Sequence, residues 1–405
     1  MILTCTMSNQ FQPQRVAAGI PTVTEVLNGG LVSESATLVR GTPGAGKTIF
    51  GLHFLAATDQ PVVYINLGEP ADYIESTANQ FDIDTSHIEF LDLSPSGEQF
   101  QGNRSYDLFE PDEVETTSLV EQIRETIETN EPTRVLVDPI TEFRHLAPDS
   151  RQFRTQVLSL IDFLKNQGTT IVLTSQAAAS VPDDDLQFLA DTVISLSATD
   201  GQRSLKVPKF RGSDFQTGPH TVTISDDGMS VWPKLDPSKH YRDGSISTLS
   251  SGINELDALL GGGITTGTIS FFSGPTGVGK TTTGLQFIIE AANRGHRSVL
   301  YSFEESKRTI LTRAEKLGMP LKEQIDAENI VIREIGADEL TLDEFTYRVR
   351  SEVETEDAEI IMIDGITGYK QAFDEDTIDA DNRLIKIGQY LRNMNVTGIV
   401  TNEVH

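Results

Sequence analysis

Residues 19–48 read GIPTVTEVLNGGLVSESATLVRGTPGAGKT, and residues 252–281 read GINELDALLGGGITTGTISFFSGPTGVGKT, which is the same pattern written a second time without a gap. Each copy passes from a Gly-Ile opening through a short amphipathic segment and a Gly-Gly turn into a β-branched run, a glycine-rich loop and a helical stretch. An internal repeat sets the organisation of a chain, because each copy is one structural unit. We therefore expect two similar domains.

Three later segments also match between the copies, and each is a short apolar run that ends in polar residues. The matching pairs are VVYINLGEP (62–70) with SVLYSFEES (298–306), VLVDPIT (135–141) with IMIDGIT (361–367), and TTIVLTSQ (169–176) with VTGIVTNE (396–403). Such strands alternate with helical patterns at 118–128 and 342–354, which predicts an α/β fold with a mostly parallel sheet flanked by helices in each domain.

The domain boundaries follow from composition. Residues 233–247, PKLDPSKHYRDGSIS, are polar, contain prolines and show no periodicity, so they are interpreted as a linker. We expect a flexible N-terminal tail at 1–15, a first domain at 16–232 and a second at 248–405. The first copy continues well past its 169–176 segment, whereas the second stops soon after 396–403. The second domain is therefore expected to lack its last strands.

Both glycine-rich loops follow the Walker A spacing, a glycine, four residues and then Gly-Lys-Thr. Their backbone N–H groups can converge on phosphate oxygens, and the following helix N-terminus adds positive potential. Lys47 and Lys280 are expected to reach the β- and γ-phosphates of ATP. Ordinary glycine-rich turns are the alternative, and two loops in the same context argue against it. The predicted nucleotide-binding residues are Gly41, Thr42, Pro43, Gly44, Ala45, Gly46, Lys47, Thr48, Gly274, Pro275, Thr276, Gly277, Val278, Gly279, Lys280 and Thr281.

The loop threonines and two strand-end aspartates are candidate Mg²⁺ ligands. Thr48 and Thr281 would place a hydroxyl on the metal, and Asp138 and Asp364 end apolar strands at the position of a Walker B carboxylate. An acidic residue often ends a strand by chance. Its presence at the matching place in both copies favours the metal-side role.

A further acidic pair follows the second strand of each copy. It reads Glu304-Glu305 in the second domain and Gly68-Glu69 in the first. A carboxylate at this place can orient and deprotonate the attacking water, so Glu69, Glu304 and Glu305 are catalytic candidates. If the first residue of the pair is the base, the first domain has lost it and relies on Glu69. The alternative is a pair of solvated acids at a strand end.

Lys209 and Arg211 lie in the segment KFRG of the first domain, on a late strand or hairpin. Side chains two residues apart on a strand share a face. Such a pair can compensate γ-phosphate charge as an arginine finger does, which makes both residues catalytic candidates. Spacing alone also fits a solvated basic patch.

The charge and residue composition exclude several functions. The chain has 32 Lys and Arg against 60 Asp and Glu, a net charge of −28, which opposes binding to nucleic acid and favours adaptation to a salt-rich cytoplasm. No apolar run approaches the roughly 18 residues of a membrane span, and no secretion signal is present, so a cytoplasmic protein is expected. Cys5 alone cannot form an intramolecular disulfide, and the seven histidines lack ligand spacing.

From near Val16 to the end the sequence resembles the KaiC family of RecA-type ATPases, in its repeat openings, both Walker A loops, the acidic pairs, VLVDPIT, IMIDGIT and the KFRG segment. The resemblance implies two RecA-like domains, a homohexamer with ATP and Mg²⁺ at subunit interfaces, and Lys209 and Arg211 supplied to a neighbour. It places the proton acceptor at Glu304 and, in the first domain, at Gly68. The family's autophosphorylated segment and a second Lys-x-Arg pair have no counterpart, so autokinase activity is not inferred.

The leading hypothesis is an ATPase that couples nucleotide state to ring assembly or to a signalling partner. The alternative is a scaffold or regulatory switch with little turnover, which Gly68 favours. A serine/threonine autokinase and a DNA recombinase are less favoured, the recombinase because of the negative charge.

Overall fold

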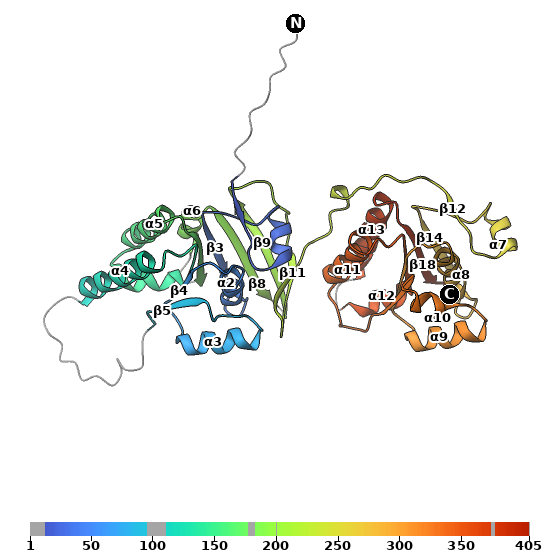
Figure 1. The fold of residues 1–405 in the computed structure, drawn as a ribbon, viewed down its shortest axis with the longest axis horizontal. Coiled ribbons are helices and arrows are strands. Elements are labelled where there is room, and N and C mark those ends of the chain that lie inside the picture. Colours follow the sequence, from blue (N-terminus) through green and yellow to red (C-terminus); the bar gives the residue numbers. More distant parts are fainter. Residues whose placement is uncertain (1–12, 95–110, 177–182, 200, 374–376, 405) are drawn as a thin grey trace, which may run out of the picture. The chain divides into compact units, whose positions relative to one another are not determined.

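The computed structural model describes residues 13–94, 111–176, 183–199, 201–373 and 377–404. The chain forms two compact units, residues 1–233 and 234–405, and each is described by itself (Figure 1). Both consist of a sheet with parallel strands that is covered by helices on its two faces. The predicted α/β fold class is confirmed.

The first unit is built on a nine-stranded sheet. From one edge to the other the order is β11 (Gly228–Trp232), β10 (His220–Ser225), β9 (Gln202–Phe210), β8 (Thr192–Thr199), β3 (Ala36–Gly41), β7 (Thr170–Gln176), β6 (Arg134–Asp138), β4 (Val62–Asn66) and β5 (Ile88–Asp92). The strands from β8 to β5 are parallel, and β9, β10 and β11 extend the sheet antiparallel. A small ladder joins β1 (Arg15–Val16) to β2 (Leu31–Val32).

Two apolar layers enclose this sheet. One layer contains α1 (Pro21–Val26), α2 (Lys47–Ala56) and α3 (Ala71–Gln80). The other contains α4 (Pro111–Asn130), the 3₁₀ helix η2 (Ile140–Leu146), α5 (Ser150–Asn166) and α6 (Asp184–Leu189). The sequence of α5 explains its place, because Phe153, Val157, Ile161 and Leu164 form one buried stripe at helical spacing.

The second unit repeats the parallel part of this plan. Its five-stranded sheet has the order β14 (Ile269–Gly274), β18 (Thr397–Glu403), β17 (Ile360–Asp364), β15 (Ser298–Ser302) and β16 (Ile330–Glu334). One face carries α8 (Lys280–Asn293), α9 (Lys307–Lys316), α10 (Leu321–Asp326) and the ladder of β12 (Thr248–Leu249) with β13 (Ile264–Thr265). The other carries α11 (Leu342–Glu354), α12 (Ile366–Ala372) and α13 (Thr377–Asn393). Helix α7 (Asn254–Leu259) corresponds to α1.

The units differ beside the strand that leads into the phosphate loop. In the first unit β3 is flanked by β8, and Leu38 is fully buried. In the second unit the corresponding β14 lies at the edge of the sheet within the described residues, and its Phe271 is 58% exposed. Helix α7 is likewise open to solvent at Leu259, whereas Val23 and Val26 of α1 are buried. The described part of the second unit therefore matches the expectation of a shorter sheet.

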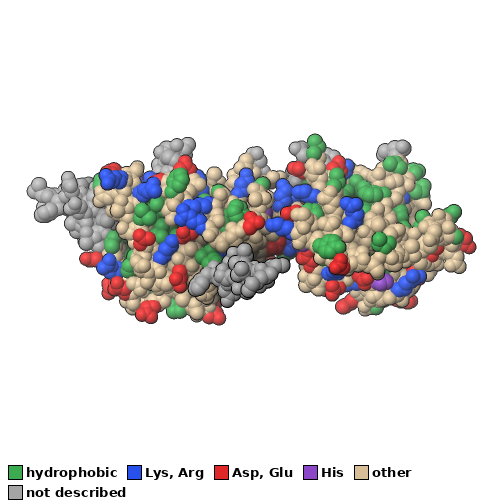
Figure 2. All heavy atoms as spheres, turned by 90° about the horizontal axis from the view of Figure 1, so that it is seen from above, with side chains coloured by type: hydrophobic (Ala, Val, Ile, Leu, Met, Phe, Trp, Pro, Cys, Tyr) green, Lys and Arg blue, Asp and Glu red, His purple; other side chains and the backbone are tan. Residues whose placement is uncertain are grey.

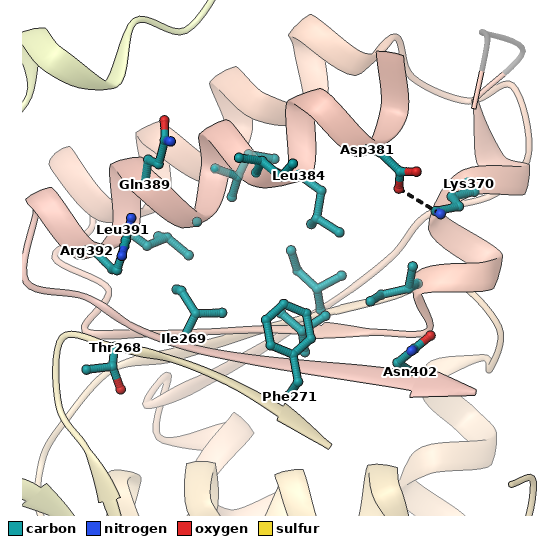
Figure 3. Close-up of a pocket in the computed structure, with 16 residues that line it drawn as sticks. Thr268, Ile269, Phe271, Lys370, Asp381, Leu384, Gln389, Leu391, Arg392 and Asn402 are labelled. Atoms are coloured by element: carbon teal, nitrogen blue, oxygen red, sulfur yellow. Dashed lines mark ion pairs between the residues drawn. The ribbon is translucent and has the colours of Figure 1, made fainter. Parts of the chain in front are cut away.

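The uncovered edge borders a groove of about 810 Å³ between α13 and the strands β14 and β18 (Figure 3). Ile269 and Phe271 lie along one wall, Leu384 and Leu391 along the other, and the Lys370–Asp381 ion pair of 2.7 Å closes one end. In the first unit Leu186 of α6 and Val193 of β8 belong to the matching apolar layer. The groove is lined by no residue of the phosphate loop, so it is not the nucleotide site.

The first unit ends at Pro233, next to the expected boundary at 232, whereas the second unit begins at Lys234 and includes the segment expected to be a linker. Residues 1–12 of the expected tail lie outside the described part, but Arg15 is in β1, where its Nη1 donates to the carbonyl of Gly30 at 3.2 Å. The segment expected as a linker packs on the second unit. This segment includes the 3₁₀ helix η3 (Pro237–Lys239). Leu235 of this segment is buried in an apolar layer of the second unit, and this one apolar side chain anchors an otherwise polar stretch.

Acidic and basic side chains are interspersed on the face drawn in Figure 2. Among the described residues, no helix is long and apolar enough to cross a membrane.

Candidate nucleotide-binding sites

The two phosphate loops have the same geometry. Gly46 and Gly279 precede α2 and α8 at φ 96° and 94°, the left-handed region that glycine adopts without strain. The ammonium of Lys47 donates to the carbonyls of Gly41 and Thr42, both at 3.0 Å. Lys280 donates in the same way to Gly274 and Pro275, at 2.9 and 3.0 Å. Each loop therefore wraps around its lysine.

In the first unit the metal-side aspartate is surrounded by hydroxyl groups. Asp138 Oδ2 accepts from Thr48 Oγ1 at 2.8 Å and from Tyr64 Oη at 2.7 Å, and Oδ1 accepts from Thr174. Burial lowers the pKa of the Lys47 ammonium, and the charges of Asp138 and Asp183 act in the opposite direction. Thr48 and Asp138 thus lie together beside the loop lysine.

The second unit repeats the threonine–aspartate pair with fewer donors. Asp364 Oδ1 accepts from Thr281 Oγ1 at 3.0 Å and from Thr401 Oγ1 at 2.7 Å. Burial raises the pKa of the Asp364 carboxyl; the hydrogen bonds from Thr401 and Thr281 lower it, and the charges of Glu305 and Glu304 raise it. The predicted residues Thr281, Asp364, Glu304 and Glu305 are therefore brought to one place.

Glu304 rests against two glycines. Its Oε1 accepts from the backbone N–H of Gly368 at 3.2 Å, and a Cβ atom on Gly365 would meet the Glu304 Cδ at 2.6 Å. A Cβ atom on Gly368 would meet the Glu304 Cγ at 2.7 Å. We call Gly365 and Gly368 the glycine cradle. A larger residue at either place would displace the glutamate, so the two glycines determine where this carboxylate lies.

The corresponding place in the first unit is filled differently. Gly68 stands where the second unit has Glu304, and Pro139 and Glu142 stand where it has the glycine cradle. A Cβ atom on Gly68 would meet the Pro139 Cδ at 3.1 Å. The next residue, Glu69, is exposed and forms no ion pair within the described residues. The first unit thus lacks both the acid and the two glycines that would hold it.

Lys209 and Arg211 lie at the end of β9, away from the phosphate loop of their own unit. The Lys209 ammonium donates to the carbonyls of Gln187 and Ala190 at 2.8 and 2.6 Å, and so caps the C-terminal end of α6. Arg211 is 60% exposed, and its Nη1 lies 3.5 Å from Asp191 Oδ1. Of the two, Arg211 has the reach of an exposed side chain, and Lys209 is bound within its own chain.

These residues fit a nucleotide with its metal. The loops offer backbone N–H groups and a lysine to phosphates, and each threonine–aspartate pair offers oxygen atoms of the kind that Mg²⁺ prefers. Within the described ranges no group of three or more His, Cys, Asp or Glu side chains could hold a metal by itself. Bound Mg²⁺ would neutralise charge on the β- and γ-phosphates.

Sequence reasoning missed Thr174, Thr401 and Tyr64. The two threonines occupy the same place in the matching segments 169–176 and 396–403, so the repeat contained a signal for them. Tyr64 has Leu300 as its counterpart, and nothing in the spacing indicates its bond to Asp138.

The fold and the two sites define a P-loop nucleotide-binding protein of the RecA-like class. The family model of the KaiC ATPase matches residues 16–236 and 249–405, and the chain belongs to that family. It is 31% identical over 349 residues to the circadian clock oscillator protein KaiC of Prochlorococcus marinus subsp. pastoris, covering 80% of this chain and 65% of that protein. It is 26% identical over 396 residues to the protein of the same name from Synechococcus elongatus, covering 93% and 74%. The chain thus spans about two thirds of the length of the first of these relatives.

Proposed function

We propose that this protein binds one ATP with Mg²⁺ in each unit, hydrolyses ATP, and couples the nucleotide state to the assembly of identical subunits into a ring. The observation that carries the proposal is the duplicated constellation of a loop lysine with a threonine–aspartate pair, Lys47 with Thr48 and Asp138, and Lys280 with Thr281 and Asp364. Membership of the KaiC family supports ATP as the nucleotide.

The positioning of the acids supports hydrolysis at the second site. Glu304 in the glycine cradle is the candidate base there, and Glu69 is the substitute candidate in the first unit, where Gly68 offers no carboxylate. Arg211 supports the assembly part of the proposal, because an exposed guanidinium can reach the γ-phosphate of a neighbouring subunit. We expect a homohexamer with ATP at the interfaces. A signalling partner of the ring would be a separate protein.

The test separates the sites by single substitutions. Lys47→Ala and Lys280→Ala proteins should each bind one ATP where the unaltered protein binds two, measured by calorimetry in Mg²⁺ and high salt. Light scattering with and without ATP reports assembly in parallel. Two ATP still bound by either variant would contradict the site assignment. Hexamers that form equally well without nucleotide would contradict the coupling.

A second candidate function is a nucleotide-dependent scaffold or switch with little turnover. Gly68 favours it for the first unit, since ATP bound there would lack the carboxylate that Glu304 offers in the second unit. Phosphate release by the Lys280→Ala protein decides between the two, because only the first site remains. The net charge of −28 argues against a DNA recombinase, and DNA should leave the rate unchanged.

A further inference from the structure

The second acid of the second unit is tied to an arginine. Glu305 Oε1 accepts from Arg313 Nη1 at 2.7 Å, and the two side chains are similarly half-buried. Arg313 lies on α9, which packs on β16 and is joined to it by a hydrogen bond from the backbone of Lys307 to Glu334. Because β15 lies between β17 and β16 in the sheet, this arginine holds Glu305 toward β16.

The first acid is held on the opposite side. Glu304 contacts the glycine cradle, which follows β17, the strand that carries Asp364. Adjacent residues of one turn are therefore fixed toward opposite neighbours of β15. The two acids are thus held by different partners, Glu304 by the loop that follows Asp364 and Glu305 by helix α9.

The ion pair is incompletely satisfied. Within the described residues, Oε2 of Glu305 and both Nε and Nη2 of Arg313 are buried without a hydrogen-bond partner. A partly exposed ion pair that leaves polar atoms unpaired contributes little net stability to a fold. Stability alone thus does not account for an arginine at this place.

The first unit offers a contrast. Counting from the acidic pair, the counterpart of Arg313 is Thr77, whose hydroxyl donates to the carbonyl of Tyr73 at 2.9 Å. Glu69 is exposed, and no arginine in the described part of the chain forms an ion pair with it. The arginine is present in the unit that has two acids and absent from the unit that has one.

We propose that Arg313 is a positioning residue of the second site: it holds Glu305 away from the phosphates, so that Glu304 is the member of the acidic pair that faces them. The proposal rests on the proposed function, since it concerns the same hydrolytic site. Its consequence is that Glu305 is a second carboxylate kept in reserve, able to reach the attacking water once Arg313 is removed.

The experiment uses the full chain with Lys47→Ala, so that phosphate release reports the second site. Single-turnover rates are measured with radiolabelled ATP and Mg²⁺, and ATP affinity is measured for each variant. Glu304→Gln should lower the rate on the order of 10²- to 10⁴-fold. Adding Arg313→Met should restore about tenfold of that loss, because the released Glu305 substitutes as base. Adding Arg313→Lys, which keeps the charge, should restore much less, and Arg308→Met on the same helix serves as the matched control.

A Glu304→Gln, Arg313→Met protein that binds ATP normally but is no faster than Glu304→Gln overturns the proposal. If Arg313→Met impairs folding, Glu305→Gln decides: a rate loss as large as that of Glu304→Gln overturns the proposal, and a much smaller loss supports it. Failure of the proposed function looks different. If the second site does not hydrolyse ATP, adding Lys280→Ala to the Lys47→Ala protein leaves phosphate release unchanged, with either arginine or methionine at position 313.

Discussion

The two units hold the same phosphate loop and the same threonine–aspartate pair, but they surround them with different neighbours. Asp138 accepts hydrogen bonds from three side chains and Asp364 from two. Gly68 faces Pro139 in the first unit, whereas Glu304 lies in the glycine cradle of the second. The residues that changed are in contact with one another. The two sites therefore share a phosphate-binding centre and differ in a set of residues that lie next to one another around it.

The largest test of this comparison removes the space for Glu304. Gly365→Ala should lower turnover at the second site on the order of 10²-fold, because the new Cβ would meet the Glu304 carboxyl carbon at 2.6 Å. Phosphate release in the Lys47→Ala background is the measurement. Gly295→Ala is the matched control, since Gly295 also has a positive φ, 87°, and its Cβ would touch nothing. Equal losses in the two variants would attribute the effect to backbone strain.

Adding the missing acid to the first site should change its turnover much less than Gly365→Ala changes turnover at the second site. Gly68→Glu is expected to raise turnover at the first site by less than about tenfold, because its Cβ meets Pro139 and no cradle receives its carboxylate. Turnover of the Lys280→Ala protein with and without Gly68→Glu measures the gain. A gain near 10²-fold would contradict the role of the glycine cradle, since the acid alone would then be sufficient for turnover.

A third test separates the two cations of the KFRG segment. Lys209→Met should destabilise the first unit by about 1 kcal/mol, because the carbonyls of Gln187 and Ala190 lose a charged donor. Arg211→Met should change stability by less than about 0.5 kcal/mol, since the side chain is exposed. Hydrogen exchange of α6 and β9 measures both. Equal protection in the two variants would show that Lys209 is not a structural cap.

The smallest expected effect is a pH-dependent change in the stability of the second unit. Burial alone would raise the pKa of Glu354, but the hydrogen bond from His240 and the charge of Arg350 hold it below its usual range. A lowered pKa adds stability above the unfolded-state value, and this stability is lost as the pH falls through the folded-state value. Glu354→Gln should therefore cost about 0.5 kcal/mol at pH 7 and nothing well below pH 4. Denaturant unfolding at both pH values checks this, and a constant difference would contradict it.

Much of the fold could be predicted, because the loop spacing and the buried strands are local patterns. Each loop lysine and each threonine–aspartate pair has its contacts at the end of the phosphate loop, and the roles of these residues toward nucleotide and metal stay predictions. The cap formed by Lys209 could not be predicted, since it depends on where α6 ends in space. The pairing of Glu305 with Arg313 depends in the same way on how a helix packs on its strand.

The segment between the repeats bears on how the second unit can be produced alone. Leu235 is buried in its apolar layer, Asn393 Nδ2 donates to the carbonyl of Pro237 at 2.8 Å, and Arg242 donates to the carbonyl of Val353 at 3.3 Å. A gene fragment that starts at Thr248 would lose both hydrogen bonds and would expose to water the apolar residues that pack against Leu235. One that starts at Lys234 keeps these contacts, and should give the more soluble product on expression.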